Sequence, residues 1–266
     1  MITTYHRPKT LDEALTLLTQ PNTFPLGGGT LLSHLMTESV EVVDLQSLGL
    51  DTVKKNGQNL ELGATLTLQV LLESEHCPDA LKSALKLEAP LNIRNSATVA
   101  GTLVSCDGRS TFASVLLATD AKLEIRELEL GDSTVQTQTS NLGDFLPLRE
   151  QIRGKLITKI IMPLNVKLAF EYVARTPADK PIVCAALAQW NSGRTRLAVG
   201  GYGKSPMLAM DGDLSSPAGR GTEGEGLIAV AARNAFHEAT DEWASAEYRM
   251  DVASTLAQRC LENITI

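Results

Sequence analysis

The spacing of apolar residues near the start of the chain is typical of an amphipathic helix. Between residues 11 and 19, leucine and alanine recur every three or four positions, the period of one helix face. Thr10 and Glu13 frame its start as a capping box, in which the threonine oxygen accepts a backbone N–H and the glutamate reaches back. Apolar runs at 24–26 and 42–45 predict strands, with a second short helix at 31–36 between them. This opening part therefore predicts a small α/β unit.

The middle of the chain is predicted to be mostly sheet with short helices inserted. Alternation of apolar and polar residues predicts strands, and a mixture of β-branched and small residues predicts a strand and a turn over 92–105. Polar caps followed by apolar residues predict the helices. The expected strands are 60–64, 122–126, 135–139 and 156–162, and the expected helices are 67–72, 79–87 and 111–118.

The pattern changes after Pro163. Strands are predicted at 167–174, 183–189 and 195–199, followed by helices at 224–238 and 245–262. Between them, residues 210–226 are rich in Gly, Ser, Pro and Asp, which predicts a mobile loop. We therefore expect an α+β protein with a first domain at 1–163, divided into parts at about 1–55 and 56–163, and a second domain at 164–266.

Composition and charge narrow the class of protein. The chain has 266 residues, of which 43% are hydrophobic and 21% charged, values typical of a folded globular protein. Its net charge of −7 argues against a nucleic-acid binder or a binder of anionic membranes. No apolar run approaches the ~20 residues of a membrane span, and no signal-peptide pattern opens the chain. We expect a cytoplasmic protein.

Neither a metal site nor a catalytic set is apparent. The four cysteines and four histidines are scattered, without the clustered spacing of metal ligands. Asp107, Asp120 and Glu124 lie near one another in sequence, but that is weak evidence for a carboxylate pair. No nucleophile motif occurs. We expect no metal ligand and no catalytic residue on this chain.

Two segments have the composition of a phosphate-binding loop. Consecutive glycines at Gly27-Gly28-Gly29, followed by Thr30, let backbone N–H groups converge on an anion. Residues 93–103 combine small residues with the hydroxyls of Thr98 and Thr102. A plain turn remains the alternative for each segment. The literal G-x-G-x-x-G at 219–224 follows no strand and is rejected as a nucleotide loop.

Taken together, these segments resemble the FAD-binding medium subunit of molybdenum hydroxylases of the carbon monoxide dehydrogenase and xanthine dehydrogenase type. The resemblance extends over nearly the whole chain. Residues 25–30 are similar to the family's A-G-G-T loop, and residues 93–103 to its I-R-N-x-A-T-I-G-G-N-L segment. Further matches, in the family's order, are Val43-Asp44-Leu45, residues 62–67, residues 116–121, residues 197–201 with Pro206, and residues 246–249.

The resemblance implies a PCMH-type FAD-binding fold. In that fold a small α/β part and a larger mixed sheet part precede a C-terminal α+β domain with a three-stranded antiparallel sheet. The implied function is electron transfer: 2Fe–2S clusters of a small partner subunit pass electrons through FAD to NAD, oxygen or another acceptor. A molybdopterin-binding large subunit oxidises the substrate, so a hetero-oligomer is expected. The alternative is a structural subunit that has lost FAD binding.

The resemblance also implies which residues contact FAD, although this chain departs from the family at several of them. The family has a polar residue at Leu31, Gly at Ala100, Asn at Thr102, Asp at Thr111 and Lys near Tyr172. Each change removes a charge, a hydrogen bond or backbone freedom, and Asp107, Arg109 or Ser110 are candidates to replace the lost contacts. The expected FAD-binding residues are Leu26, Gly27, Gly28, Gly29, Thr30, Leu31, Thr98, Ala100, Gly101, Thr102, Thr111 and Ile157.

Overall fold

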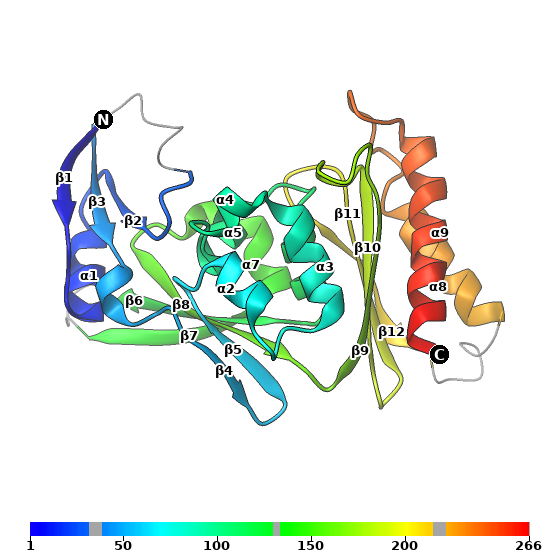
Figure 1. The fold of residues 1–266 in the computed structure, drawn as a ribbon, viewed down its shortest axis with the longest axis horizontal. Helices are drawn as coiled ribbons and strands as arrows, with labels where there is room; N and C mark the ends of the chain where they lie inside the picture. Colours follow the sequence, from blue (N-terminus) through cyan, green and yellow to red (C-terminus); the bar gives the residue numbers. More distant parts are fainter. Residues whose placement is uncertain (32–38, 130–133, 215–221, 266) are drawn as a thin grey trace. The chain divides into compact units, whose positions relative to one another are not determined.

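The structure is a computed structural model that describes residues 1–31, 39–129, 134–214 and 222–265. It contains two compact units, each assembled from separate stretches of chain (Figure 1). Unit 1 comprises residues 1–75, 91–105 and 122–162, and unit 2 comprises residues 76–90, 106–121 and 163–266. The units interleave along the sequence, so the consecutive domains expected on either side of residue 163 stay a prediction.

Unit 1 begins with a three-stranded sheet in the order β1-β3-β2. The strands β1 (Ile2–His6), β2 (Thr23–Leu26) and β3 (Val40–Asp44) are all parallel. Helix α1 (Leu11–Leu18) connects β1 to β2 and buries its apolar face. The capping box is confirmed: Thr10 Oγ1 accepts from Glu13 N at 3.2 Å, and the Glu13 carboxylate accepts from Lys9 N at 2.9 Å. The helix expected at 31–36 lies outside the described residues apart from Leu31.

A five-stranded sheet forms the larger part of unit 1, in the order β4-β5-β8-β6-β7. Its strands are β4 (Val53–Asn56), β5 (Asn59–Gly63), β6 (Lys122–Leu128), β7 (Val135–Asn141) and β8 (Lys155–Pro163). The α-helices of this part are α2 (Leu68–Glu73), α4 (Leu91–Arg94), α5 (Val99–Ser105) and α7 (Leu142–Leu148), and the short 3₁₀ turns are η1 (Gln46–Leu48) and η2 (Arg149–Gln151).

The strand and turn expected over 92–105 are wrong, because this segment forms α4 and α5. The backbone just before α5 is held by Val99 N, which donates to Leu66 O at 2.9 Å, and by Ala97 O, which accepts from Leu68 N at 2.9 Å. Val99 and Leu103 are then fully buried on one face of the helix. Burial of that face outweighs the weak strand preference of β-branched residues.

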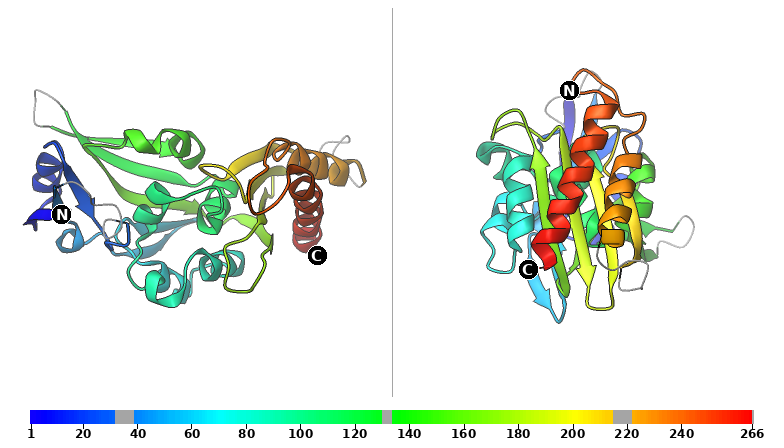
Figure 2. Two further views of the ribbon diagram at one scale, coloured as in Figure 1. Left: turned by 90° about the horizontal axis from the view of Figure 1, so that it is seen from above. Right: turned by 90° about the vertical axis from the view of Figure 1, so that its right-hand side faces the viewer.

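Unit 2 is built on an antiparallel sheet in the order β12-β11-β10-β9. Its strands are β9 (Val166–Val173), β10 (Val183–Trp190), β11 (Arg194–Gly200) and β12 (Met207–Asp213). Helices α8 (Thr222–Asn234) and α9 (Ala246–Thr265) cover one face, as the right-hand view of Figure 2 shows. Helices α3 (Asp79–Glu88) and α6 (Thr111–Ala118) also pack on this sheet although they precede Pro163 in the sequence; α3 lies on the side away from α9 (Figure 1).

The fourth strand of this sheet, β12, corrects two expectations. The sheet is four-stranded rather than three-stranded, and residues 210–213, expected to open a mobile loop, continue a strand. Asp211 explains why a polar segment pairs here, because its carboxylate binds the guanidinium groups of Arg194 and Arg196, both at 2.8 Å or less. The other end of the expected loop is helical from Thr222, and residues 215–221 lie outside the described part.

Two findings concern the part of the chain that the structure describes. No helix there is both long enough and apolar enough to span a bilayer. No group of three or more His, Cys, Asp or Glu side chains there comes together as a metal site would require.

Candidate functional site

The glycine turn lies at the carboxyl edge of the three-stranded parallel sheet. Strand β2 ends at Leu26 and its neighbour β3 ends at Asp44, and the two ends are joined by Leu45 N, which donates to Leu26 O at 3.1 Å. Residues 27–30 leave the sheet at this point. Open sheets of parallel strands bind their ligands at the carboxyl ends of the strands, so the turn occupies the edge where a cofactor is expected.

The structure brings the two glycine- and threonine-rich segments into contact. A Cβ atom added to Gly27 would lie 2.8 Å from Thr98 Oγ1, and one added to Gly28 would lie 1.6 Å from the carbonyl oxygen of Ser96. Gly29 adopts a φ of +71°, which side-chain-bearing residues rarely adopt. Gly27 and Gly28 are therefore required by the close approach of two loops, and Gly29 by its backbone conformation.

The turn offers backbone donors. Among the described residues, none accepts a hydrogen bond from the N–H groups of Gly27, Gly28 or Gly29, although the turn is half-buried. Consecutive N–H groups without a protein acceptor form a site suited to a phosphate group. The pyrophosphate of FAD fits this donor set.

Thr98 organises the second segment. Its buried Oγ1 accepts from Gly101 N at 3.2 Å, and Thr102 Oγ1 donates to Thr98 O at 2.8 Å. Ala100 lies within α5 and is not among the described residues with positive φ. The departure from glycine at this position therefore requires no strained backbone.

The other expected FAD contacts have different environments. Ile157 lies on β8 of unit 1 and is only 3% exposed. Thr111 belongs to unit 2, where its fully buried hydroxyl lies 2.7 Å from Ala84 O and 3.2 Å from a Glu88 oxygen. Tyr172, also in unit 2, is 40% exposed and stacks on Phe170. Leu31, next to the glycine turn, is 45% exposed.

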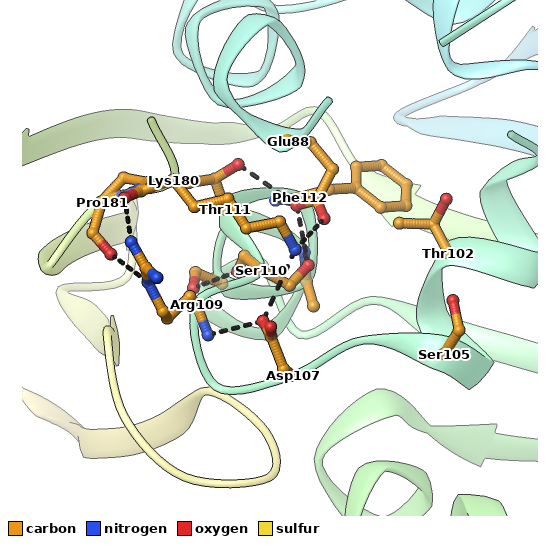
Figure 3. A network of polar contacts seen from close by, with 12 residues as sticks. Glu88, Thr102, Ser105, Asp107, Arg109, Ser110, Thr111, Phe112, Lys180 and Pro181 are labelled. Atoms are coloured by element: carbon orange, nitrogen blue, oxygen red, sulfur yellow. Dashed lines mark hydrogen bonds and ion pairs between the residues drawn. The ribbon is translucent and has the colours of Figure 1, made fainter. Parts of the chain in front are cut away.

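Glu88 is a buried charged residue that the sequence analysis did not single out (Figure 3). It is 6% exposed, and one carboxylate oxygen accepts from Ser110 Oγ at 2.8 Å and from Phe112 N at 2.9 Å. Lys180 Nζ lies 3.4 Å from its other oxygen. Burial of Lys180 disfavours its charge, but Glu88 and Asp107 outweigh that and raise its pKa. The sequence does contain a signal for this burial. Glu88 lies at helical spacing from Leu81 and Leu85, so it falls on the apolar face of α3.

The three candidates for replacement contacts to FAD are engaged within unit 2. Asp107 lies 3.6 Å from Lys180 Nζ, and Ser110 Oγ binds Glu88. Arg109 Nε donates to Pro181 O at 3.0 Å, and its Nη2 donates to Lys180 O. These contacts hold the segment before α6 in place.

Two buried cysteines of unit 2 have weakly acidic thiols. Burial raises the pKa of the Cys77 and Cys184 thiols to about 12, so neither is a thiolate at neutral pH. Cys184 is fully buried and close to Ser114 Oγ.

Comparisons with known proteins show the family of the chain. Residues 1–165 match the family described as FAD binding domain in molybdopterin dehydrogenase. The chain is 27% identical to the uncharacterized protein YgfM of Escherichia coli, covering 96% of this chain and 94% of that one. It is 25% identical to the glyceraldehyde dehydrogenase medium chain of Sulfolobus acidocaldarius, covering 98% and 97%, and 26% identical to the carbon monoxide dehydrogenase medium chain of Afipia carboxidovorans, covering 97% and 95%.

Solved structures show the same fold. A chain of quinoline 2-oxidoreductase from Pseudomonas putida superposes with a TM-score of 0.79 at 21% identity, covering 98% of this chain and 96% of that one. A chain of carbon monoxide dehydrogenase from Oligotropha carboxidovorans gives a TM-score of 0.79 at 23% identity, covering 97% and 96%. The expected α+β fold of the flavin subunit is confirmed.

The family match covers more than half of the chain and includes both loop segments, and the relatives match over nearly their full lengths. FAD is the cofactor that this family binds, and the N–H groups of residues 27–29 have no acceptor among the described residues. The chain belongs to the family of FAD-binding domains in molybdopterin dehydrogenases, as a medium subunit of the molybdenum hydroxylase type.

Proposed function

We propose that this subunit transfers electrons through FAD from 2Fe–2S clusters of a small partner subunit to NAD, oxygen or another acceptor. The observation that carries the proposal is the turn of Gly27, Gly28 and Gly29, whose N–H groups have no acceptor among the described residues. Bound FAD supplies a redox centre that accepts and releases one or two electrons. The protein supplies binding, orientation and the electrostatic surroundings of that centre.

The residues have distinct roles in this proposal. The N–H groups of Gly27, Gly28 and Gly29 donate to the pyrophosphate, and Thr30 adds a hydroxyl at the same turn. Thr98 holds the two loops together, because it lies against Gly27 and caps Gly101. Leu26, Leu31, Ala100, Thr102 and Ile157 line the cofactor site within unit 1.

The partners proposed for this subunit follow from the relatives. Two of them are named medium chains, of glyceraldehyde dehydrogenase and of carbon monoxide dehydrogenase, and another is named subunit alpha of the 6-hydroxypseudooxynicotine dehydrogenase complex of Paenarthrobacter nicotinovorans. A medium chain functions beside other chains. We infer a large molybdopterin-binding subunit that oxidises the substrate and a small subunit that carries the 2Fe–2S clusters.

A structural subunit without FAD is the second candidate. It is favoured by Thr111, whose hydroxyl is engaged within unit 2, and by the exposed Leu31 beside the glycine turn. Each missing polar contact weakens cofactor binding by about 0.5–1.5 kcal/mol. The intact donor turn supports the flavoprotein instead.

The visible absorption spectrum of the purified chain distinguishes the two candidates. We expect a flavin spectrum and about one FAD released per chain on heating, the stoichiometry of a single site. A colourless sample is incubated with excess FAD and measured again. A folded chain that still binds no FAD overturns the flavoprotein proposal and supports the structural subunit.

A further inference from the structure

Two arginines of unit 2 lie over one tryptophan. The guanidinium carbon of Arg109 is 4.4 Å from the ring centroid of Trp243, and that of Arg175 is 4.6 Å from the same centroid. Trp243 is 37% exposed, Arg175 is exposed and Arg109 is half-buried. We call Arg109, Arg175 and Trp243 the arginine–tryptophan patch.

The loop that presents Trp243 is held from inside by a buried charge. Arg249 is fully buried, and its guanidinium donates to Ala239 O at 2.5 Å, to Ala244 O at 2.9 Å and to Asp241 Oδ1 at 2.7 Å. The same Asp241 oxygen accepts from Trp243 N at 2.8 Å. These hydrogen bonds of the buried Arg249 tie it to the loop that carries Trp243.

The patch carries positive charge that the described residues do not neutralise. No carboxylate among them pairs with the side chain of Arg109 or of Arg175. Two hydrogen bonds to the carbonyls of Lys180 and Pro181 fix the Arg109 side chain without compensating its charge. The chain as a whole carries a net charge of −7. Two uncompensated guanidinium groups beside an aromatic ring on an acidic protein point to an anionic partner.

We propose that the arginine–tryptophan patch is a docking surface for an acidic peptide segment of a partner subunit. Arginine and tryptophan are the residues enriched where binding energy concentrates at protein interfaces. Arg109 and Arg175 already lie over the indole ring, so a nucleotide base would have to displace one of them in order to stack. A carboxylate of a peptide, in contrast, can accept hydrogen bonds from the outer edges of the two guanidinium groups while both stay over the ring. The inference rests on the proposed assembly with partner subunits.

Tryptophan fluorescence of the full chain tests this proposal without requiring the assembled complex. The chain has two tryptophans, so Trp190→Phe leaves Trp243 as the reporter. Oligoglutamate is titrated at low salt, with oligoglutamine, ADP and inorganic phosphate in parallel. Arg175→Glu tests the patch. Arg153→Glu is the matched control, because Arg153 is exposed and lies over the Phe24 ring at 5.7 Å in unit 1.

We expect a saturable change in Trp243 emission with oligoglutamate, lost at high salt because screening weakens exposed charge pairs. Arg175→Glu should weaken the apparent affinity about tenfold, since it exchanges an attraction for a repulsion, and Arg153→Glu should leave it unchanged. No response, or equal responses of the two variants, overturns the proposal. A response to ADP or phosphate but not to oligoglutamate makes the patch a small-anion site and also overturns it.

The FAD content of Arg175→Glu separates this proposal from the proposed function. We expect the variant to contain as much FAD as the parent chain, because Arg175 is not among the proposed FAD-binding residues. A variant that loses both FAD and the peptide response would assign Arg175 to the cofactor site and overturn the docking proposal. Loss of the peptide response alone supports it.

Discussion

At the scale of single residues, the glycine turn combines two different demands on the chain. Gly28 has no room for a Cβ, since it would lie 1.6 Å from Ser96 O. Gly29 has room, with only a Leu26 methyl at 3.5 Å, but adopts a φ of +71°. A substitution of Gly28 therefore tests loop packing, whereas a substitution of Gly29 tests the orientation of the backbone donors.

We expect Gly29→Ala to reduce FAD affinity about tenfold or more, because a charge-assisted hydrogen bond contributes about 1.5–3 kcal/mol. Gly57→Ala is the matched control, since Gly57 lies in unit 1 with a φ of +58° and open space around it. Both substitutions cost about 1–2 kcal/mol of backbone strain. FAD content and FAD titration are measured for both. Equal FAD binding by the two variants would remove Gly29 from the pyrophosphate site.

Arg249 is the largest fully buried side chain among the described residues. We expect Arg249→Met to lower the free energy of unfolding by about 3 kcal/mol, since breaking a buried ionic network leaves its partners unsatisfied. Arg233→Met is the control, because the Arg233–Asp251 pair is exposed, and it should cost less than about 1 kcal/mol. Denaturant unfolding measures both. If both variants lose a similar amount of unfolding free energy, the buried Arg249 network does not stabilise the fold more than the exposed pair does.

At the scale of elements, helix α6 depends on a carboxylate from another helix. Ser110 caps α6 by accepting from Ala113 N, and Glu88 at the end of α3 accepts from Ser110 Oγ and Phe112 N. An acidic group near the start of a helix also interacts favourably with the helix dipole. The two helices are thus joined by polar contacts as well as by their apolar faces.

We expect Glu88→Gln to destabilise unit 2 by about 2 kcal/mol, because hydrogen bonds to a buried charged group are stronger than neutral ones. The control is Glu129→Gln, at an exposed position with one hydrogen bond from Thr134, which should change stability by less than about 0.5 kcal/mol. Unfolding is followed by Trp190 and Trp243 fluorescence, since both tryptophans lie in unit 2. An unchanged transition in Glu88→Gln would contradict this role of the carboxylate.

At the scale of the whole molecule, cofactor binding should be coupled to thermal stability. A ligand that binds only the folded state at about a hundredfold its Kd adds about 2.7 kcal/mol. We therefore expect the chain freed of FAD to unfold at a lower temperature and to recover when FAD is added back. Calorimetry with and without FAD measures the shift. If the unfolding temperature is the same with and without FAD, the structural subunit is supported.

Much of the fold could be predicted from local pattern. The capping box at Thr10 and Glu13, the apolar period of α1 and the alternation in β6 depend on neighbours in the sequence, and the structure confirms these elements. Strand β12 and helix α5 could not be predicted in the same way. Their sequences are polar or small, and they are stabilised by distant partners, namely the Arg194–Asp211 pair and the burial of Leu103.

The sequence by itself determined the α+β class and, through the resemblance of its motifs to a known family, the two segments proposed to bind FAD, because such motifs and local periodicity depend on consecutive residues. Only the tertiary structure decided that Gly28 abuts Ser96, that Ala100 is helical, and that α3 and α6 pack on the C-terminal sheet. The tertiary structure alone also revealed the contacts of Glu88 and the arginine–tryptophan patch. Such contacts join residues far apart in the chain, and their energies depend on burial, which the local pattern does not specify.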